Sequence, residues 1–179
     1  MKNELEAIAQ PLMNEGNALL EQKKYTEAIA KYSKVIQSSP NYVPALRKLA
    51  LSHTMLDQLG QAVNIYKRVV KLKPKDTQIK AKLSKVLSRQ GKEFSKQGNL
   101  LKAIEIYQKV ITLQPEQSEI FYTSFGDALK QNNKINEAIE AYKKAVELNP
   151  ENRKACLGLG RAYLAKAKLM PTPSTKESA

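Results

Sequence analysis

The sequence has little of several residue types that mark common protein classes. It contains one cysteine, Cys156, one histidine, His53, and no tryptophan. A lone cysteine excludes an internal disulfide framework, and a lone histidine argues against a metal centre built on several imidazoles. No apolar run approaches the ~20 residues of a membrane helix, and the start lacks the basic and apolar parts of a secretory signal. We therefore expect a cytoplasmic protein.

What the chain has in excess is positive charge. Its 179 residues include 30 Lys and Arg against 17 Asp and Glu, which gives a formal net charge of +13. Hydrophobic residues make up 42% and charged residues 26%, a profile typical of a folded globular protein rather than a disordered one. An excess of this sign favours partners that carry negative charge.

The sequence also contains a fourfold repeat. Each copy has an Ala-x3-Tyr pair, a small residue twelve positions before the alanine, and a proline twelve positions after it. These signature residues are Gly16, Ala28, Tyr32 and Pro40; Ala50, Ala62, Tyr66 and Pro74; Gly91, Ala103, Tyr107 and Pro115; and Gly126, Ala138, Tyr142 and Pro150. Apolar residues between small residue and proline recur at helical spacing, with a polar turn in the middle. Each copy therefore predicts a helix, a short turn and a second helix that ends at the proline.

At these positions the chain resembles the tetratricopeptide repeat (TPR) family. The resemblance implies an all-α, right-handed α-solenoid of four helix-turn-helix repeats and a C-terminal capping helix. It also implies a scaffold that binds other proteins. We place the solenoid at residues 1–168, with repeats at about 9–42, 43–76, 84–117 and 119–152. A capping helix with a polar outer face is expected at 153–168, and a disordered Pro/Ser/Thr-rich tail or linker at 169–179.

Three departures from the period carry further expectations. Seven extra residues before the third repeat, almost two helical turns, predict a helical extension over 77–83 that Asp76 or Thr77 caps. Pro11 is expected to kink or restart the first helix. A fifth unit begins at Leu159, Gly160 and Tyr163, but its pattern stops there.

The family's first helices line a concave surface, and the matching positions here are rich in positive charge. Of thirty such positions nine are basic and two are acidic. The candidate binding residues are Asn17, Arg47, Lys48, Lys85, Arg89, Lys92, Lys96, Lys130, Lys154 and Arg161. A concave wall of one sign draws in oppositely charged segments. The alternative is that these are solvated helix faces that only serve solubility.

Some family members hold a C-terminal carboxylate through a Lys/Asn/Asn/Lys/Arg clamp. The resemblance transfers this clamp to Met13, Asn17, Lys48, Lys85 and Arg89, of which the second, fourth and fifth match. A looser site for acidic peptides, centred on Lys48, Lys85, Arg89 and Lys92, fits the sequence better, since arginine grips carboxylates bidentately.

No pattern predicts catalysis, a cofactor or a metal site. His53 falls at an aromatic core position, and Cys156 is expected on the buried face of the last helix. We therefore expect a non-enzymatic scaffold that binds an acidic partner segment in a basic groove. One alternative is that the chain is the N-terminal repeat region of a larger protein with a transferase-type catalytic domain. Non-specific nucleic-acid binding is less favoured, because the aromatics lie at core positions. Self-association through the ends of the array is a further option.

Overall fold

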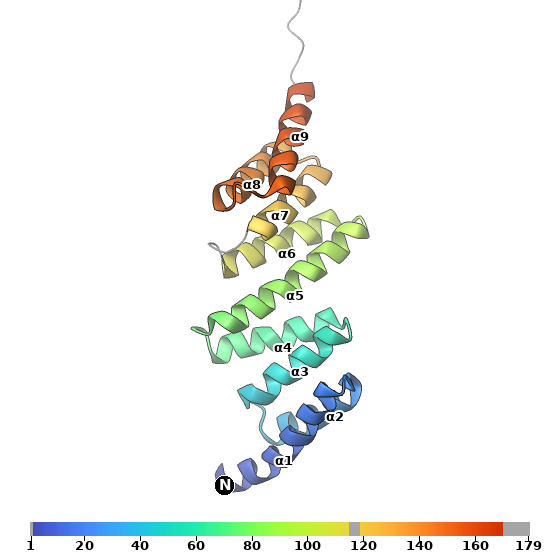
Figure 1. The fold of residues 1–179 in the computed structure, drawn as a ribbon, viewed down its shortest axis with the longest axis vertical. Helices are drawn as coiled ribbons and strands as arrows, with labels where there is room; N and C mark the ends of the chain where they lie inside the picture. The colour runs from blue at the N-terminus through green and yellow to red at the C-terminus, as the bar shows by residue number, and fades with distance from the viewer. Residues whose placement is uncertain (1, 115–118, 170–179) are drawn as a thin grey trace, which may run out of the picture. The chain divides into compact units, whose positions relative to one another are not determined.

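A computed structural model describes residues 2–114 and 119–169, and the regular structure within these ranges is helical (Figure 1). The helices are α1 (Lys2–Glu21), α2 (Tyr25–Ser38), α3 (Val43–Met55), α4 (Leu59–Leu72), α5 (Thr77–Lys96), α6 (Leu100–Leu113), α7 (Glu119–Gln131), α8 (Ile135–Leu148) and α9 (Arg153–Leu169). The all-α fold expected from the repeats is confirmed. The chain divides into two compact units, unit 1 up to Gln90 and unit 2 from Gly91, with the boundary inside α5.

The turns inside the hairpins share one backbone geometry. The middle residue of each turn has a positive φ: Lys23 at 60°, Asp57 at 58°, Gly98 at 76° and Asn133 at 59°. Each turn is closed by an amide that donates to a carbonyl five residues earlier, as from Lys134 to Leu129 at 2.9 Å. Glycine adopts this left-handed region freely, and Asn and Asp tolerate it better than Lys does. The four turns therefore reverse the chain in the same way with different residues.

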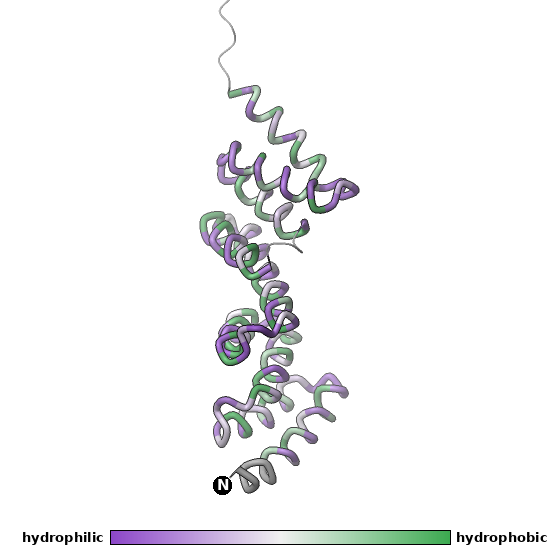
Figure 2. The backbone as a smooth tube through the Cα atoms, turned by 90° about the vertical axis from the view of Figure 1, so that its left-hand side faces the viewer, coloured by the Kyte–Doolittle hydropathy of each residue, from purple (hydrophilic) through white to green (hydrophobic). Residues whose placement is uncertain are grey.

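In the hairpins a small residue of the first helix packs closely on a tyrosine of the second helix and holds the two helices together. A Cβ added at Gly16 would lie 2.7 Å from the Tyr32 ring, and one added at Gly126 would lie 2.8 Å from the Tyr142 ring. Both rings are fully buried, so they have little freedom to move away. Hydrophobic and hydrophilic residues alternate along the helices (Figure 2), as expected where one face of each helix is packed.

The predicted helical extension is present. Helix α5 begins at Thr77, and the amide of Ile79 donates to Asp76 Oδ1 at 3.0 Å, which makes Asp76 the N-cap. The added apolar residues Ile79 and Leu83 are buried. At the other end of unit 1, α1 runs without interruption from Lys2 to Glu21 and includes Pro11. The expectation that Pro11 restarts the helix was therefore wrong.

Helix α9 differs from the polar capping helix that the sequence predicts. Its inner face is packed through Ala155, Gly158 and Ala162, which are buried. Its outer side, however, exposes Leu157 by 58% and Leu164 by 65%. A polar outer face is therefore wrong for these positions. Pro115 and most of the expected tail, residues 170–179, lie outside the described residues.

Among residues 2–114 and 119–169, no helix combines the length and the apolar character needed to cross a membrane.

Candidate functional site

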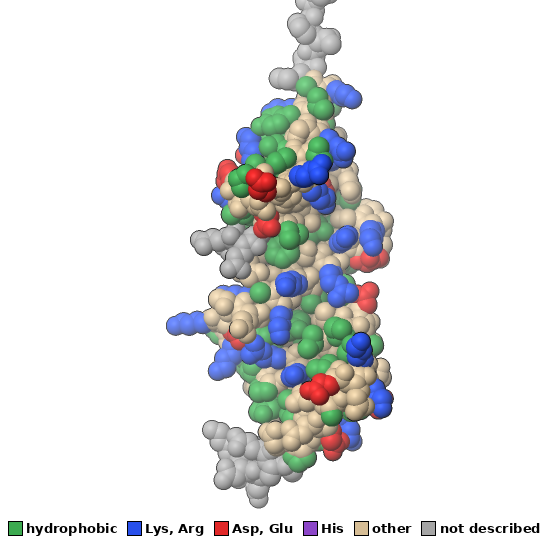
Figure 3. Space-filling model, viewed as in Figure 1, with side chains coloured by type: hydrophobic (Ala, Val, Ile, Leu, Met, Phe, Trp, Pro, Cys, Tyr) green, Lys and Arg blue, Asp and Glu red, His purple; other side chains and the backbone are tan. Residues whose placement is uncertain are grey.

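The sequence-predicted binding residues fall into two groups, one in each unit. The unit 1 basic surface consists of Arg47 and Lys48 on α3 and of Lys85 and Arg89 on α5. Figure 3 shows Lys and Arg side chains gathered along α5. Arg89 Nη2 lies 2.8 Å from Asp57 Oδ1, and its Nη1 donates to the carbonyl of Thr54 at 3.4 Å.

A second contact joins the start of α3 to the start of α5. Arg47 Nη1 lies 3.5 Å from Asp76 Oδ2, the carboxylate that also caps α5. Both arginines are therefore held at the two ends of the α3–α5 pair. Lys48 and Lys85 lie between these contacts, and neither pairs with a carboxylate in the described part of the chain. These two ammonium groups are available to a ligand.

Asn17 has a different role from the one expected. The Tyr32 hydroxyl donates to Asn17 Oδ1 at 3.0 Å, so this amide serves the hairpin of α1 and α2. Burial, with a smaller contribution from Glu21, raises the pKa of Tyr32 to about 12. Met13, the first position of the clamp, is only 5% exposed and belongs to the core of unit 1. That assignment was wrong, because the face of α1 that holds Met13 packs inward.

The unit 2 basic surface consists of Lys92 and Lys96 on α5, Lys130 on α7, and Lys154 and Arg161 on α9. Lys96 pairs with Glu93 on its own helix at 3.7 Å. No carboxylate partner is found for Lys92, Lys130 or Arg161 among the residues that the structure describes.

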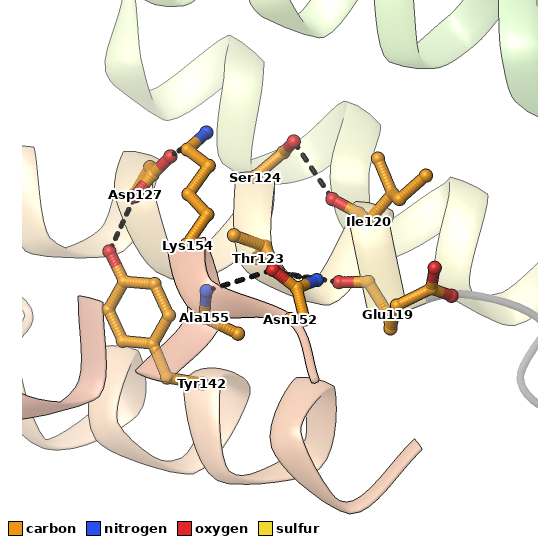
Figure 4. Close-up of polar contacts among 9 residues, drawn as sticks. All are labelled: Glu119, Ile120, Thr123, Ser124, Asp127, Tyr142, Asn152, Lys154 and Ala155. Carbon is orange, nitrogen blue, oxygen red and sulfur yellow. Dashed lines mark hydrogen bonds and ion pairs between the residues drawn. The ribbon is translucent and has the colours of Figure 1, made fainter. Parts of the chain in front are cut away.

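Lys154 belongs to a small network around Asp127 (Figure 4). Lys154 Nζ lies 2.7 Å from Asp127 Oδ2, and the Tyr142 hydroxyl donates to Asp127 Oδ1 at 2.7 Å. Burial and then the Asp127 carboxylate raise the pKa of Tyr142 far above its usual value. The network connects α7, α8 and α9. Lys154 therefore takes part in an interaction within the fold and is less available to a ligand than an unpaired lysine.

Two residues set aside as core are more exposed than the sequence suggested. His53 is half-buried, and its Nδ1 shares a hydrogen bond of 2.6 Å with Gln58 Oε1. Cys156 is exposed, so its placement on the buried face was wrong. Within the described ranges, no group of three or more His, Cys, Asp or Glu side chains is arranged to hold a metal ion.

Sequence reasoning missed the ion-pairing roles of the carboxylates Asp57, Asp76 and Asp127. Asp57 follows the first helix of its repeat, and Asp76 precedes the next one, so each lies about thirty positions from its arginine. No local spacing signals such pairs. A cue was available for Asp127 alone, since it follows the signature residue Gly126 directly, as Asn17 follows Gly16.

Comparison with protein families matches three stretches of the chain. Residues 19–86 and 84–117 each match a tetratricopeptide repeat, and residues 126–166 match a TPR repeat. Together these stretches include parts of all the hairpins and most of α9.

Comparison with individual proteins also finds relatives. The chain is 28% identical over 120 residues to "Protein O-mannosyl-transferase TMTC1" of Mus musculus, which is 67% of this chain. It is 30% identical over 131 residues to "Hsp70-Hsp90 organizing protein 3" of Arabidopsis thaliana, 72% of this chain. It spans only 12% and 22%, respectively, of the length of these relatives. Among solved structures, that of MamA has a TM-score of 0.65 at 23% identity, covering 89% of this chain and 83% of MamA. The likeness to MamA concerns the fold.

Proposed function

Because the chain belongs to the tetratricopeptide repeat family, whose fold serves as a scaffold for protein interactions, we propose that its basic surfaces bind an acidic segment of a partner protein. The observation that carries this proposal is the pair Lys48 and Lys85, which have no carboxylate partner in the described chain, whereas Arg47 and Arg89 on the same two helices are paired with Asp76 and Asp57. Cations that the fold leaves unneutralised attract anionic groups over distances of about a Debye length, ~10 Å.

The unit 1 basic surface supports contacts of two kinds. Carboxylates of the partner would pair with Lys48 and Lys85. Apolar side chains would rest on Met55, which is exposed on α3, and on half-buried Leu51. Ordering a flexible segment offsets part of the contact energy, so we expect a dissociation constant on the order of micromolar.

Side-chain carboxylates fit this surface better than a terminal carboxylate does. A clamp of the kind found in some family members would use Met13, which is buried, and Asn17, which is hydrogen-bonded to Tyr32. The name of the Arabidopsis relative connects that protein with Hsp70 and Hsp90. For this chain we propose internal acidic segments as ligands.

The test measures the anisotropy of a fluorescein-labelled peptide of alternating Glu and Leu residues with the whole chain. The variant Lys48→Glu/Lys85→Glu should bind it at least about tenfold more weakly, because two attractive contacts become repulsive. The matched control, Lys67→Glu/Lys71→Glu, makes the same charge change at exposed positions of α4 and should stay within about twofold. Equal losses in both variants would reject a defined site in favour of general charge attraction.

Two further ligands distinguish this proposal from the alternatives. A peptide amidated at its C-terminus should bind as well as the free acid; a strong preference for the free acid would restore the clamp. A single-stranded oligonucleotide of similar charge should bind more weakly than the peptide and lose affinity more steeply with salt. A reversed order would favour nucleic-acid binding.

A second candidate role is that of a repeat region in a larger enzyme. It is favoured by the similarity to the mannosyl-transferase, which covers 12% of that protein. An antibody raised against residues 2–114 should then detect a cellular product much larger than this 20.1 kDa chain. A product of the chain's own size would count against this role.

A further inference from the structure

Helix α9 repeats the first helix of a hairpin, but within the residues that the structure describes no second helix of that hairpin follows it. In three hairpins the signature glycine is covered by a tyrosine, at 2.7 Å for Gly16, 3.1 Å for Gly91 and 2.8 Å for Gly126. The corresponding residue of α9 is Gly160, and no heavy atom lies within 4 Å of a Cβ placed there. A glycine inside a helix costs about 1 kcal/mol relative to alanine. At Gly160 no side chain of the described residues fills the space that the glycine leaves open.

The surroundings of Gly160 form an apolar face, which we call the α9 docking face. It consists of Cys156, Leu159, Gly160 and Tyr163, which share one side of the helix at spacings of three and four residues. Cys156 and Gly160 are exposed, and Tyr163 is 45% exposed. In α7 the residue that matches exposed Tyr163 is Leu129, which is buried in the core of unit 2 with residues of α8, whereas Leu159 is partly buried against that core as its counterpart Phe125 is.

A hollow of about 600 Å³ runs beside this face, between α8 and α9. Ile139, Glu140 and Lys143 line it from α8, and Tyr163 and Lys166 line it from α9. A second helix of a fifth hairpin would pack along α9 from this side. Asn136 and Glu137 complete the lining, so polar and charged residues surround the apolar side chain of Ile139 and the ring of Tyr163, an arrangement that fits an amphipathic helix laid into a groove.

We propose that the α9 docking face binds an amphipathic helix of a partner protein, with an aromatic side chain placed over Gly160. The chain's own hairpins define the occupant: an Ala-x3-Tyr pair, the alanine allowing close approach and the ring filling the space above glycine. Charge adds a second requirement. The hollow beside the face is lined by Glu137 and Glu140 and by Lys143 and Lys166, so a helix that carries both acidic and basic flanking residues is favoured.

This site is distinct from the basic surfaces. Lys154, Leu157 and Arg161 lie on another side of α9, about 90° or more from the centre of the docking face at 100° per residue. A failure of acidic peptides on Lys48 and Lys85 therefore leaves this proposal standing, and the reverse holds as well.

The probe is a peptide of residues 135–148, the chain's own α8, with a lactam bridge between Glu140 and Lys144 on its outer face. The bridge reduces the cost of forming a short helix. Cys156, the chain's single cysteine, reports binding, because a bound helix would cover its thiol. The peptide should slow the reaction of Cys156 with a thiol reagent in a saturable way, with a dissociation constant on the order of 10–100 μM. The same peptide with Tyr142→Ala should bind at least about tenfold more weakly, since the ring is its anchor.

Variants of the whole chain complete the test. Gly160→Leu meets no neighbour, so it should melt at or above the wild-type temperature and yet bind the peptide at least about tenfold more weakly. Leu157→Ala, the control, removes exposed apolar surface beside the face and should bind as the wild type does. Unchanged binding by Gly160→Leu would overturn the proposal. So would equal protection of Cys156 by a peptide of glutamates alone, or a dimer of the free chain that already covers Cys156.

Discussion

The first and fourth hairpins are built alike and differ at one polar position. In α1–α2, Tyr32 packs on Gly16 and donates to Asn17 at 3.0 Å. In α7–α8, Tyr142 packs on Gly126 and donates to the next residue, Asp127, at 2.7 Å. The acceptor is neutral in the first case and charged in the second.

This difference allows the contribution of the glycine–tyrosine packing to be distinguished from that of the acceptor's charge. The glycine and the tyrosine fix how closely the two helices approach, and that geometry is the same in both hairpins. The residue after the glycine determines whether the hairpin also forms an ion pair with a neighbouring helix. Asp127 draws in Lys154 and so connects the fourth hairpin to α9, whereas Asn17 is bonded within its own hairpin.

The largest expected effect tests the shared part of the comparison. Tyr32→Ala and Tyr142→Ala should each lower the free energy of unfolding by about 3–5 kcal/mol, because both rings are fully buried and leave large cavities. Urea unfolding followed by circular dichroism measures the loss. Tyr163→Ala, at an exposed tyrosine, should cost less than about 1 kcal/mol. A loss at one buried ring less than half of that at the other would show that the two hairpins are not equivalent.

The spacing of residues in the sequence was sufficient to predict most of the fold, because the residues that pack the two helices of each hairpin recur at fixed intervals. The small residue, the alanine and the tyrosine each occupy one helical face, so their recurrence predicted the hairpins. The seven added residues kept the apolar stripe in phase, and Asp76 was a recognisable cap. α9 was misjudged because its exposed leucines were counted as part of a polar helix.

An intermediate effect is expected at alkaline pH. The folded state raises the pKa of Tyr32 from 10.0 to about 12 and that of Tyr142 still further. Folding therefore holds these protons more tightly than the unfolded chain does. The resulting stability is present below pH 10 and is lost as the pH rises from 10 through 12 and beyond.

Unfolding free energies measured at pH 9, 10 and 11 check this dependence. The wild type should lose stability across the series. Tyr142→Phe and Tyr32→Phe should each lose less stability than the wild type and by similar amounts, because up to pH 11 both folded tyrosines stay protonated and the loss follows the ionisation of the unfolded chain. Parallel curves for all three proteins would contradict the assignment.

The smallest effect comes from making the fourth hairpin like the first. Asp127→Asn keeps an acceptor for Tyr142 but removes the ion pair with Lys154, which is largely exposed. We expect a change of no more than about 1 kcal/mol in the free energy of unfolding at neutral pH. The absorbance of tyrosinate near 295 nm, in a chain without tryptophan, should show Tyr142 ionising at lower pH than in the wild type. An unchanged titration would mean that burial alone raises its pKa.

The candidate site was harder to predict than the fold. Matching the family's clamp position by position placed Met13 in a binding site, although that part of α1 packs inward. The same matching also included Lys48 and Lys85 but gave no sign that Arg47 and Arg89 are held by Asp76 and Asp57. Such pairs depend on which helices become neighbours, and their residues are too far apart in sequence for any local pattern to reveal them.

The common backbone geometry of the four turns has a consequence for how such a chain lengthens. Since Lys23, Asp57, Gly98 and Asn133 all reverse the chain in one way within their hairpins, a duplicated hairpin would bring along a turn of the same form. Adding a whole hairpin then requires no new turn geometry inside it. Selection can act on the surface side chains while the helical packing stays the same.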